Sequence, residues 1–350
     1  MTQLSVRSRV ESRVARTLLG LPRPLVRRLA GRPIVRDGFT LDPSAHLALV
    51  LHRLTGKKSS HDLSEADARA DLDLEAALLA PPPRPLARVE DRALPGPGGP
   101  LPVRIYTPHH LDAPAPALVY FHGGGFVLGG LDSHDPVCRI LADDARCVVI
   151  AIDYRLAPEH PFPAAADDAL AAFCWVAEHA DELGVDPRRI AVGGDSAGGN
   201  LSAVVALDTR GEAHRPCLQL LIYPAVDLTM SFPSIERLGV GFFLEKATME
   251  WFMDRYLPDR AVRTHPRASP WFVGDLAGAA PALVITAGFD PLRDEGDAYA
   301  ARLRDAGVAV DHRCVGDMFH GFINAAGALA RGAETLASIA ASLRAAFARP

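Results

Sequence analysis

A serine between glycines is the residue of this chain whose setting best suits nucleophilic chemistry. Ser196 is the centre of Gly-Asp-Ser-Ala-Gly (residues 194–198), after the apolar run 190–192 and before the helix-forming run 201–207. A strand that passes straight into a helix through one serine strains the backbone there and requires small residues two positions away on either side. The pattern predicts a hydroxyl held out for attack at a helix N-terminus, where backbone N–H groups favour a developing negative charge.

A second cluster of glycines could stabilise such a charge. The apolar run 117–121 predicts a buried strand, and it ends in His-Gly-Gly-Gly-Phe, residues 122–126. Glycines leave backbone N–H groups free to point at a ligand, as an oxyanion hole requires. The alternative is a flexible glycine turn that continues into residues 129–130. A histidine at a strand end is more often a structural hydrogen-bonding group than a base, so we assign His122 to the support of the loop.

A carboxylate follows the serine in the chain order that this kind of turn uses. Asp290 is the first acid after the apolar run 281–288, which predicts a strand. Asp294 and Glu295 come later, and we expect them in the opening turn of a helix, where acids interact with the helix dipole. Asp290 is therefore the predicted acid.

A histidine completes the set. Residues 308–315 alternate like a strand, and residues 318–322, which include His320, are predicted to form a loop before the last helix. His312 is the nearest competitor, but it falls inside the strand, where it has little freedom to reach Ser196. His320 is therefore the predicted base.

Taken together, these motifs resemble the hormone-sensitive-lipase-like branch of the α/β-hydrolases, whose bacterial members are carboxylesterases. The resemblance spans most of residues 100–345, and the stretches that carry it are 122–126, 153–164, 194–200, 290–296 and 320–322. It implies an α/β-hydrolase fold, with a mostly parallel central sheet flanked by helices and a helical cap.

The resemblance also implies a role for each candidate residue. Ser196 would be the nucleophile, His320 the general base and acid, and Asp290 the carboxylate that orients the histidine. The oxyanion hole would be formed by the backbone N–H groups of three residues, Gly124, Gly125 and Ala197, and Gly123 would shape the loop. These groups would hydrolyse short- to medium-chain acyl esters through an acyl-enzyme, without a metal or an organic cofactor.

Other functions remain compatible with the same residues. An amidase, a lactonase or a small-molecule deacetylase would use the same triad, since pocket shape decides which acyl bond is cleaved. A ligand-binding protein on a hydrolase scaffold, like the plant hormone receptors that resemble this family, is disfavoured because such receptors lose a triad residue. Action on emulsified fat would need a large mobile apolar lid, and the region at 228–270 is short and rich in charge.

The rest of the chain divides into a cap and a catalytic domain. We predict an N-terminal helical cap segment at 1–84, which includes a helix at 41–54, and a catalytic domain at 85–350 with a second cap insert at about 228–270. The insert is the most aromatic part of the chain, and a few of its side chains should line the acyl or alcohol pocket. A turn at 95–100 is predicted between two antiparallel edge strands.

Composition limits the partners. The formal net charge of −5 gives no reason to expect nucleic acid, and a small-molecule ester is the expected partner. No apolar run approaches the ~18 residues of a membrane span, and no cleavable signal sequence is visible. Homodimers are common in related esterases, which implies a possible homodimer here.

Cysteine usage favours a cytoplasmic protein. Five cysteines are scattered singly through predicted core segments, without a C-x-x-C pair, and they are Cys138, Cys147, Cys174, Cys217 and Cys314. An odd number of separate cysteines favours reduced, buried thiols.

The N-terminus has a composition of its own. Residues 1–37 carry nine arginines and two acids, and Val6, Val10, Val14 and Leu18 recur every fourth position. This pattern predicts a helix that lies either on an anionic membrane or in the cap. We favour the cap, without stable membrane anchoring, because the apolar face is narrow and lacks aromatic residues.

Overall fold

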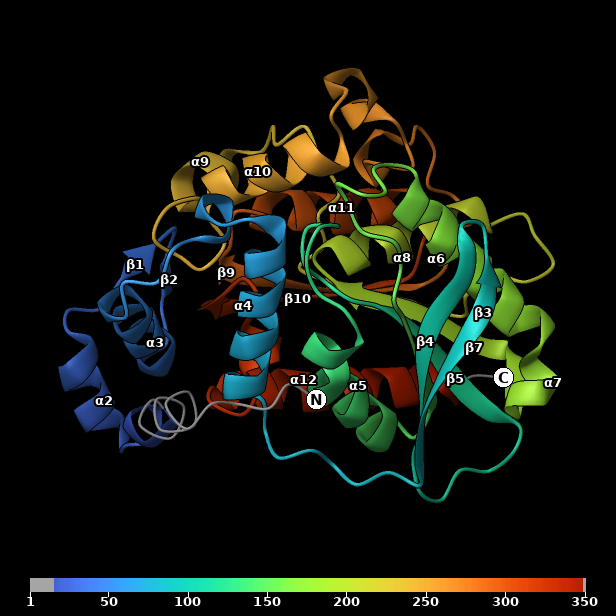
Figure 1. Cartoon of the computed structure of the whole chain (residues 1–350), viewed down its shortest axis with the longest axis horizontal. Coiled ribbons are helices and arrows are strands. Elements are labelled where there is room, and N and C mark those ends of the chain that lie inside the picture. The colour runs from blue at the N-terminus through green and yellow to red at the C-terminus, as the bar shows by residue number, and fades with distance from the viewer. Residues whose placement is uncertain (1–15, 349–350) are drawn as a thin grey trace.

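A computed structural model describes residues 16–348, and an eight-stranded sheet forms its centre (Figure 1). The strand order is β10-β9-β8-β7-β5-β6-β4-β3. The strands are β3 (Arg88–Gly96), β4 (Gly99–Thr107), β5 (Ala115–Phe121), β6 (Val148–Ile152), β7 (Val185–Asp195), β8 (Gln219–Ile222), β9 (Ala282–Phe289) and β10 (Val310–Phe319). Strands β5 to β10 pair in parallel, whereas β4 pairs antiparallel with both β3 and β6. The predicted mostly parallel sheet is confirmed.

Helices cover both faces of this sheet (Figure 1). The helices α5 (Leu131–Ala145) and α12 (Ala330–Phe347) lie on one face, and α6 (Ala164–Glu178), α8 (Ala197–Asp208) and α11 (Arg293–Asp305) on the other. A short helix, α7 (Ala180–Leu183), precedes β7. Because both faces are covered, the inner strands β5, β6, β8 and β9 are nearly continuous apolar runs.

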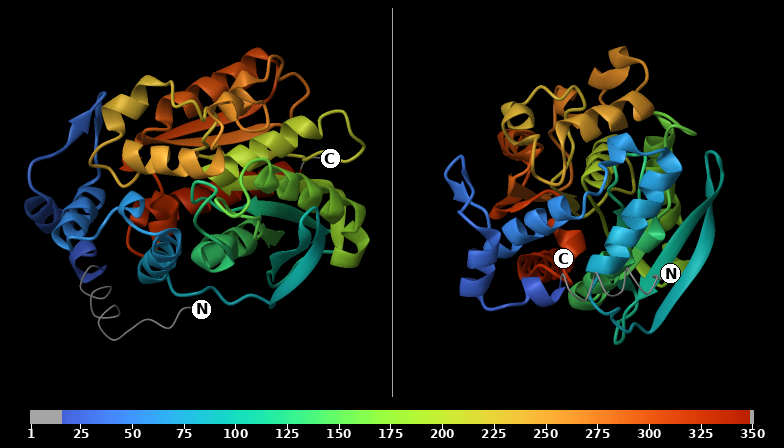
Figure 2. Two further views of the ribbon diagram at one scale, coloured as in Figure 1. Left: turned by 45° about the horizontal axis from the view of Figure 1, so that its top comes forward. Right: turned by 60° about the vertical axis from the view of Figure 1, so that its left-hand side comes forward.

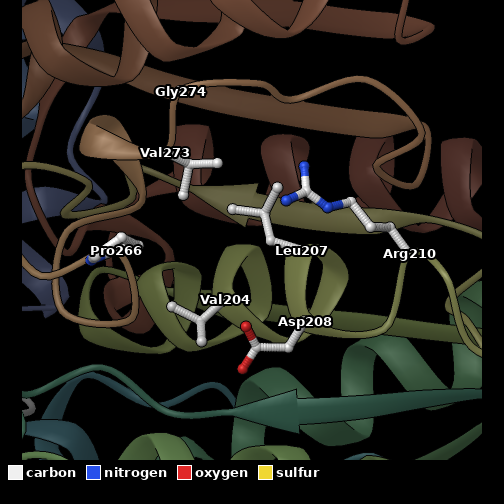
Figure 3. Close-up of a pocket in the computed structure, with 7 residues that line it drawn as sticks. All are labelled: Val204, Leu207, Asp208, Arg210, Pro266, Val273 and Gly274. Carbon is white, nitrogen blue, oxygen red and sulfur yellow. The ribbon is translucent and has the colours of Figure 1, made fainter.

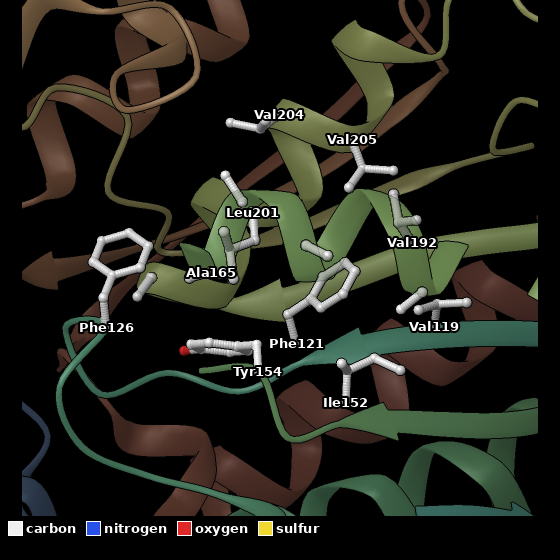
Figure 4. Packing of buried hydrophobic residues seen from close by; sticks show 14 of the residues in the cluster. Val119, Phe121, Phe126, Ile152, Tyr154, Ala165, Val192, Leu201, Val204 and Val205 are labelled. Carbon is white, nitrogen blue, oxygen red and sulfur yellow. The ribbon is translucent and has the colours of Figure 1, made fainter. Parts of the chain in front are cut away.

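The core shows how neighbouring strand residues serve opposite faces. On β5, Val119 and Phe121 belong to the cluster that includes α8, whereas Leu118 and Tyr120 belong to the cluster that includes α5 and α12. Figure 4 shows Leu201, Val204 and Val205 of α8 close to the side chains of Val119, Phe121 and Val192. This packing fixes the axis of α8, the helix that starts directly after Ser196.

Two segments correspond in sequence to the predicted cap. The N-terminal part contains α2 (Arg23–Ala30), β1 (Val35–Arg36), β2 (Phe39–Thr40), α3 (Pro43–Leu54), the 3₁₀ turn η1 (Ser60–Asp62) and α4 (Glu65–Leu79). The insert contains α9 (Pro233–Leu238), α10 (Lys246–Tyr256), η2 (Arg260–Thr264) and η3 (Pro270–Phe272). Figure 2 shows the blue N-terminal segment beside the yellow and orange insert. The domain boundaries at 84 and at 228–270 stay a prediction.

Polar contacts join the two cap segments. Arg255 of α10 pairs with Glu65 of α4 (Nε–Oε1 2.7 Å), and His61 Nδ1 lies 2.9 Å from Thr248 Oγ1. The predicted helix at 41–54 corresponds to α3, but sequence analysis missed α4. Its start is marked by Ser64, whose side chain caps the helix by accepting a hydrogen bond from Asp67 N.

Two local predictions are wrong, and a third is confirmed in a tighter form. The strand predicted at 308–315 continues to Phe319, through an irregularity after Val315, so the loop begins at His320 and not at residue 318. The turn predicted at 95–100 joins two antiparallel strands as expected, but it is tighter, because β3 and β4 pair as far as Gly96 and Gly99. Of the cysteines, only Cys138 and Cys147 are buried, and Cys314 is exposed because β10 is an edge strand with a neighbour on one side only.

The predicted basic N-terminal helix lies mostly outside the described residues, which exclude Val6, Val10 and Val14. Leu18, its last apolar position, packs half-buried against a small cluster that includes Leu19 and Leu47. Within residues 16–348, no helix combines the length and the hydropathy needed to cross a membrane.

Close packing of backbones at the end of β7 gives a first testable prediction. A Cβ atom on Gly198 would overlap the carbonyl oxygen of Phe121, so Gly198→Ala should push α8 away from β5. We expect it to lower the free energy of unfolding by about 1–3 kcal/mol or more and to reduce expression of folded protein. Gly211→Ala is the control, since a Cβ there meets no atom within 4 Å. Urea denaturation of both variants checks this, and equal stability of the two would contradict the packing argument.

Candidate active site

Ser196 lies at the sharp turn between β7 and α8. Its backbone has φ 56° and ψ −115°, a conformation that non-glycine residues rarely adopt and that the surrounding hydrogen bonds must impose. Ser196 N donates to Ile222 O (2.9 Å) on β8, and Ser196 O accepts from Asn200 N (3.1 Å). A Cβ on Gly194 or Gly198 would overlap backbone atoms, so this turn requires glycine on both sides of the serine.

Asp290 and His320 are brought together because they follow neighbouring parallel strands. Asp290 comes directly after β9 and His320 directly after β10, and Asp290 Oδ2 lies 2.8 Å from His320 Nδ1. The other carboxylate oxygen, Oδ1, accepts from Leu292 N (2.8 Å). Since Asp290 is fully buried and engages Nδ1, the ring nitrogen of His320 that remains for proton transfer is Nε2.

The end of β8 connects these two residues to the serine. Tyr223 follows β8, and its ring packs against the His320 imidazole with 4.5 Å between ring centroids. Ala225 N then donates to Ser196 O (3.3 Å), and Asn200 Nδ2 donates to Ala225 O (2.7 Å). The segment after β8 thus lies between the serine and the Asp290–His320 pair.

One of the later acids, Asp294, and the competing histidine lie elsewhere. Asp294 pairs with Arg237 of α9 (2.7 Å). His312, in the middle of β10 opposite Val284, lies 3.0 Å from Asp297 and 3.2 Å from Thr286 Oγ1. Neither residue contacts Ser196 in the part of the chain that the structure describes.

The glycine loop after β5 contains backbone conformations that only glycine adopts readily. Gly124 has φ 121° and Gly125 has φ 63°. A Cβ on Gly124 would overlap Leu128 O, and a Cβ on Gly125 would overlap the ring of Phe252 in the cap. Gly125 and Ala197, the first residue of α8, line the same cavity as Ser196, and Gly124 precedes Gly125 in the loop.

His122 supports this loop from within the protein. It is buried, its Nδ1 lies 2.8 Å from Gly123 O, and its ring stacks on Tyr154 with 4.2 Å between centroids. Tyr154 OH donates in turn to His122 O (2.8 Å). Burial, with His134 nearby, lowers the pKa of His122 to about 3, so the ring is neutral at neutral pH. Tyr154 belongs to the 153–164 stretch, which contacts the loop again where Ala157 N donates to Phe126 O (2.9 Å).

Asp195 is a functional residue to which sequence analysis gave no role. Its buried carboxylate accepts hydrogen bonds from Tyr120 OH (2.7 Å) and Gly123 N (3.0 Å), and Asn324 Nδ2 donates to it at 3.3 Å. Burial by itself would raise its pKa, but the nearby His134 and these donors outweigh burial and lower the pKa to about 2. Asp195 therefore joins the serine turn, the glycine loop and the segment after His320. An acid directly after the uncharged stretch 190–194 was the available signal.

Glu295 corrects a prediction. We expected it to face the helix dipole in the first turn of α11, but it is fully buried and its Oε1 accepts from Val226 N (2.7 Å) and Asp227 N (3.1 Å). Burial raises the pKa of this carboxyl well above its usual range, although the two N–H groups act in the opposite direction. Glu295 thus connects α11, which follows Asp290, to the segment after β8. No local sequence signal marks this contact.

The cavity beside Ser196 is small and mostly apolar. Its volume is about 30 Å³, which holds one or two water molecules. Residues of the insert line its walls, namely Leu228, Met230, Leu244, Met249, Phe252 and Met253. Leu292, two residues after Asp290, also lines it. Asp227 also lines it, and its carboxylate accepts hydrogen bonds from Thr229 and Ser231. The walls have the character expected for an acyl group.

A larger cavity, of about 220 Å³, lies away from this site. Figure 3 shows Val204, Leu207 and Asp208 from the C-terminal half of α8 on one side, and Pro266, Val273 and Gly274 on the other. None of the candidate site residues lines it.

Comparisons with known proteins agree with this geometry. A family model described as alpha/beta hydrolase fold matches residues 118–324. The chain is 48% identical over 315 residues to the protein named carboxylic ester hydrolase LipN from Mycobacterium tuberculosis, which covers 87% of this chain and 83% of that protein. It is 42% identical over 311 residues to ethyl acetate hydrolase from Pseudomonas putida, over 87% of this chain and 98% of that protein.

Solved structures are similar over nearly their whole length. An ester hydrolase from the metagenome of Lake Arreo, in complex with a bipyridine phosphonate derivative, matches with a TM-score of 0.85 and 40% identity, over 88% of this chain and 100% of that one. A hyperthermophilic esterase from Pyrobaculum calidifontis matches with a TM-score of 0.79 and 42% identity, over 85% and 97% of the two chains.

The buried carboxyl of Glu295 gives a prediction about stability and pH. The pKa of this group is higher in the folded state than in the unfolded chain, so the unfolded chain loses its proton first as the pH rises. The free energy of unfolding should therefore fall as the pH rises above the ordinary pKa of about 4.3. Glu295→Gln keeps an acceptor for the two N–H groups and has no charge. We expect it to match the wild type near pH 4 and to be more stable near pH 7.

Denaturant titrations of wild type and variant between pH 4 and 8 make this measurement. Glu295→Ala is the counterpart, because it leaves two buried N–H groups without their acceptor and should destabilise by about 1–3 kcal/mol at every pH. A Glu295→Gln protein that is less stable than the wild type at pH 7 would show that the carboxylate is ionised and paired.

Proposed function

We propose that this chain, which belongs to the α/β-hydrolase family in its hormone-sensitive-lipase-like branch, is a serine carboxylesterase acting on short- to medium-chain acyl esters. The family is the one that the sequence motifs resembled. The observation that supports the activity most directly is the 2.8 Å contact between Asp290 and His320 at the same sheet edge as the strained Ser196 turn.

The proposed mechanism assigns a role to each residue of the candidate site. His320 Nε2 takes the proton of the Ser196 hydroxyl, and Ser196 Oγ attacks the ester carbonyl. The N–H groups of Gly124, Gly125 and Ala197 stabilise the oxyanion of the tetrahedral intermediate. His320 gives its proton to the leaving alcohol, and the buried Asp290 carboxylate stabilises the imidazolium while it exists. Water then enters, loses a proton to His320 and attacks the acyl carbon. The acid leaves as the bond to Ser196 Oγ breaks, and His320 returns its proton to Ser196 Oγ.

The cavity walls support an acyl chain of modest length. An acyl group must fit between Ser196 and the apolar side chains of the insert, and the space present is about 30 Å³. The ring of Phe252 lies against Gly125, which would donate to the oxyanion, so it limits the space on that side. A small-molecule ester is the proposed substrate class, and a longer chain needs displacement of these side chains.

We also propose a cytoplasmic location. The five cysteines are free thiols, which a reducing compartment maintains. The homodimer stays a prediction from the family resemblance.

The catalytic assignment is checked with p-nitrophenyl esters from acetate to palmitate. We expect the highest kcat/KM at short or medium chains, and a loss of more than about 10³-fold in Ser196→Ala and in His320→Ala because each removes a group that acts in the transition state. Ser338→Ala, on the exposed side of α12, is the matched control and should keep wild-type rates. Persistent activity in Ser196→Ala would contradict the nucleophile, and a wild type inactive on all esters would favour an amide or lactone substrate.

The role of Phe252 gives a prediction on chain length. Phe252→Ala should enlarge the cavity, so that the ratio of kcat/KM for octanoate to that for acetate rises about tenfold or more. Met253→Leu is a control of conserved volume at a neighbouring wall position, and it should keep the wild-type order of substrates. An unchanged order in Phe252→Ala would mean that the acyl chain lies elsewhere.

A further inference from the structure

A small hairpin in the N-terminal segment contacts the catalytic loops. Its strands β1 and β2 pair antiparallel, and they are joined by Asp37 and Gly38, which both have positive φ (50° and 82°). Such a two-residue turn favours Asp-Gly because both central residues are left-handed. The hairpin carries Asp37 at its tip and Phe39 directly after the turn.

Asp37 forms an ion pair with the buried guanidinium of Arg293, which follows the predicted acid Asp290. Arg293 Nη2 donates to Asp37 Oδ2 at 2.6 Å, and the Arg293 side chain is 7% exposed. The same guanidinium donates to Gly288 O (2.9 Å) and to Asp294 Oδ1 (3.0 Å). Gly288 precedes Asp290 by two residues and Arg293 follows it by three, so this network spans the turn that carries Asp290.

Phe39 contacts the strand that leads to His320. A Cβ atom on Gly316 would overlap the Phe39 ring, and the Arg293 guanidinium carbon lies 5.8 Å from the centre of that ring. Just after the hairpin, Asp42 N donates to Asp317 O (2.9 Å). Gly316 and Asp317 occupy the irregular stretch of β10 between Val315 and Phe319, directly before His320. The hairpin therefore touches both segments whose ends meet in the Asp290–His320 hydrogen bond.

A second arginine side chain belongs to the same network. Arg237 of the insert lies 3.3 Å from Asp37 Oδ2 through Nε and 2.7 Å from Asp294 Oδ2 through Nη2. Its side chain is half-exposed (47%), so its contribution is weaker than that of Arg293. Three parts of the chain, namely the hairpin, the insert and the turn after β9, thus meet in one group of alternating charges.

We propose that the hairpin at residues 35–40 is a clamp that positions the Asp290–His320 pair, with Asp37 and Phe39 as positioning residues. This proposal rests on the proposed function. Without Asp37, the buried Arg293 keeps only Asp294 as a carboxylate partner, and the turn that carries Asp290 loses its outer support. A displacement of about 1 Å in a catalytic group can cost up to about 10²-fold in rate. The effect should appear in kcat, because neither Asp37 nor Phe39 lines the cavity beside Ser196.

The test uses the full chain and the variants Asp37→Asn, Asp37→Glu and Phe39→Ala, with p-nitrophenyl butyrate as substrate. We expect Asp37→Asn and Phe39→Ala to lower kcat about tenfold with KM changed less than twofold, and Asp37→Glu to recover most of the rate. Asp311→Asn is the matched control, since it removes an exposed Asp–Arg pair on the same β10 strand, with Arg313, far from the hairpin. It should leave kcat unchanged.

A spectroscopic readout separates positioning from stability. The proton shared by Asp290 and His320 should give a low-field ¹H NMR resonance in the wild type, and we expect it to broaden or move in Asp37→Asn and not in Asp311→Asn. Arg237→Gln is a milder variant that leaves the Asp37–Arg293 contact in place; it should lower kcat less than Asp37→Asn and remain folded.

Two results would overturn the proposal. The first is folded Asp37→Asn or Arg237→Gln protein with wild-type kcat and an unchanged low-field proton, and the second is a rise in KM with kcat unchanged, which would make the hairpin part of substrate access. Failure of the proposed function is separate, because it would appear as retained activity in Ser196→Ala.

Discussion

The carboxyl ends of parallel strands lie at one edge of a sheet, and the whole candidate site depends on this constraint. Ser196, Asp290 and His320 each follow directly after a strand, and those strands (β7, β9 and β10) run parallel. β8 lies between the serine strand and the acid strand. With strands about 4.8 Å apart, the serine and the acid cannot meet directly, so in the proposed triad the histidine that binds Asp290 must lie between them. Tyr223, directly after β8, packs against the histidine ring.

Buried carboxylates are a consequence of building a site at this edge. An acid in the interior is tolerated where hydrogen-bond donors replace water. Asp195 has the Tyr120 hydroxyl and Gly123 N, with His134 close by, and its pKa falls to about 2. Glu295 has two backbone N–H groups but also lies near the carboxylates of Asp227 and Asp290, and burial raises its pKa. Burial acts in the same direction on both acids, and the neighbouring charges and hydrogen-bond donors shift the pKa values of Asp195 and Glu295 in opposite directions.

Much of the fold and of the candidate site could be predicted because the signals are local. Apolar runs identified β5, β7 and β9, and the glycines around Ser196 identified the turn into α8. What sequence analysis missed depends on residues distant in the chain. Glu295 resembles an ordinary first-turn acid until α11 is packed against the segment at 226–227. Cys314 resembles a core residue until the strand order makes β10 an edge.

The N-terminal segment and the candidate site contact each other directly through an ion pair. A boundary near residue 84 divides the sequence where its composition changes, but Asp37, on one side of it, is bound to Arg293, on the other. Burying a guanidinium that is 7% exposed requires carboxylate partners, since an unpaired cation in the interior is costly. Asp294 supplies one such partner from the same helix, and Asp37 supplies the second from the hairpin. The turn that carries Asp290 therefore depends for its environment on a segment that comes some 250 residues earlier in the chain.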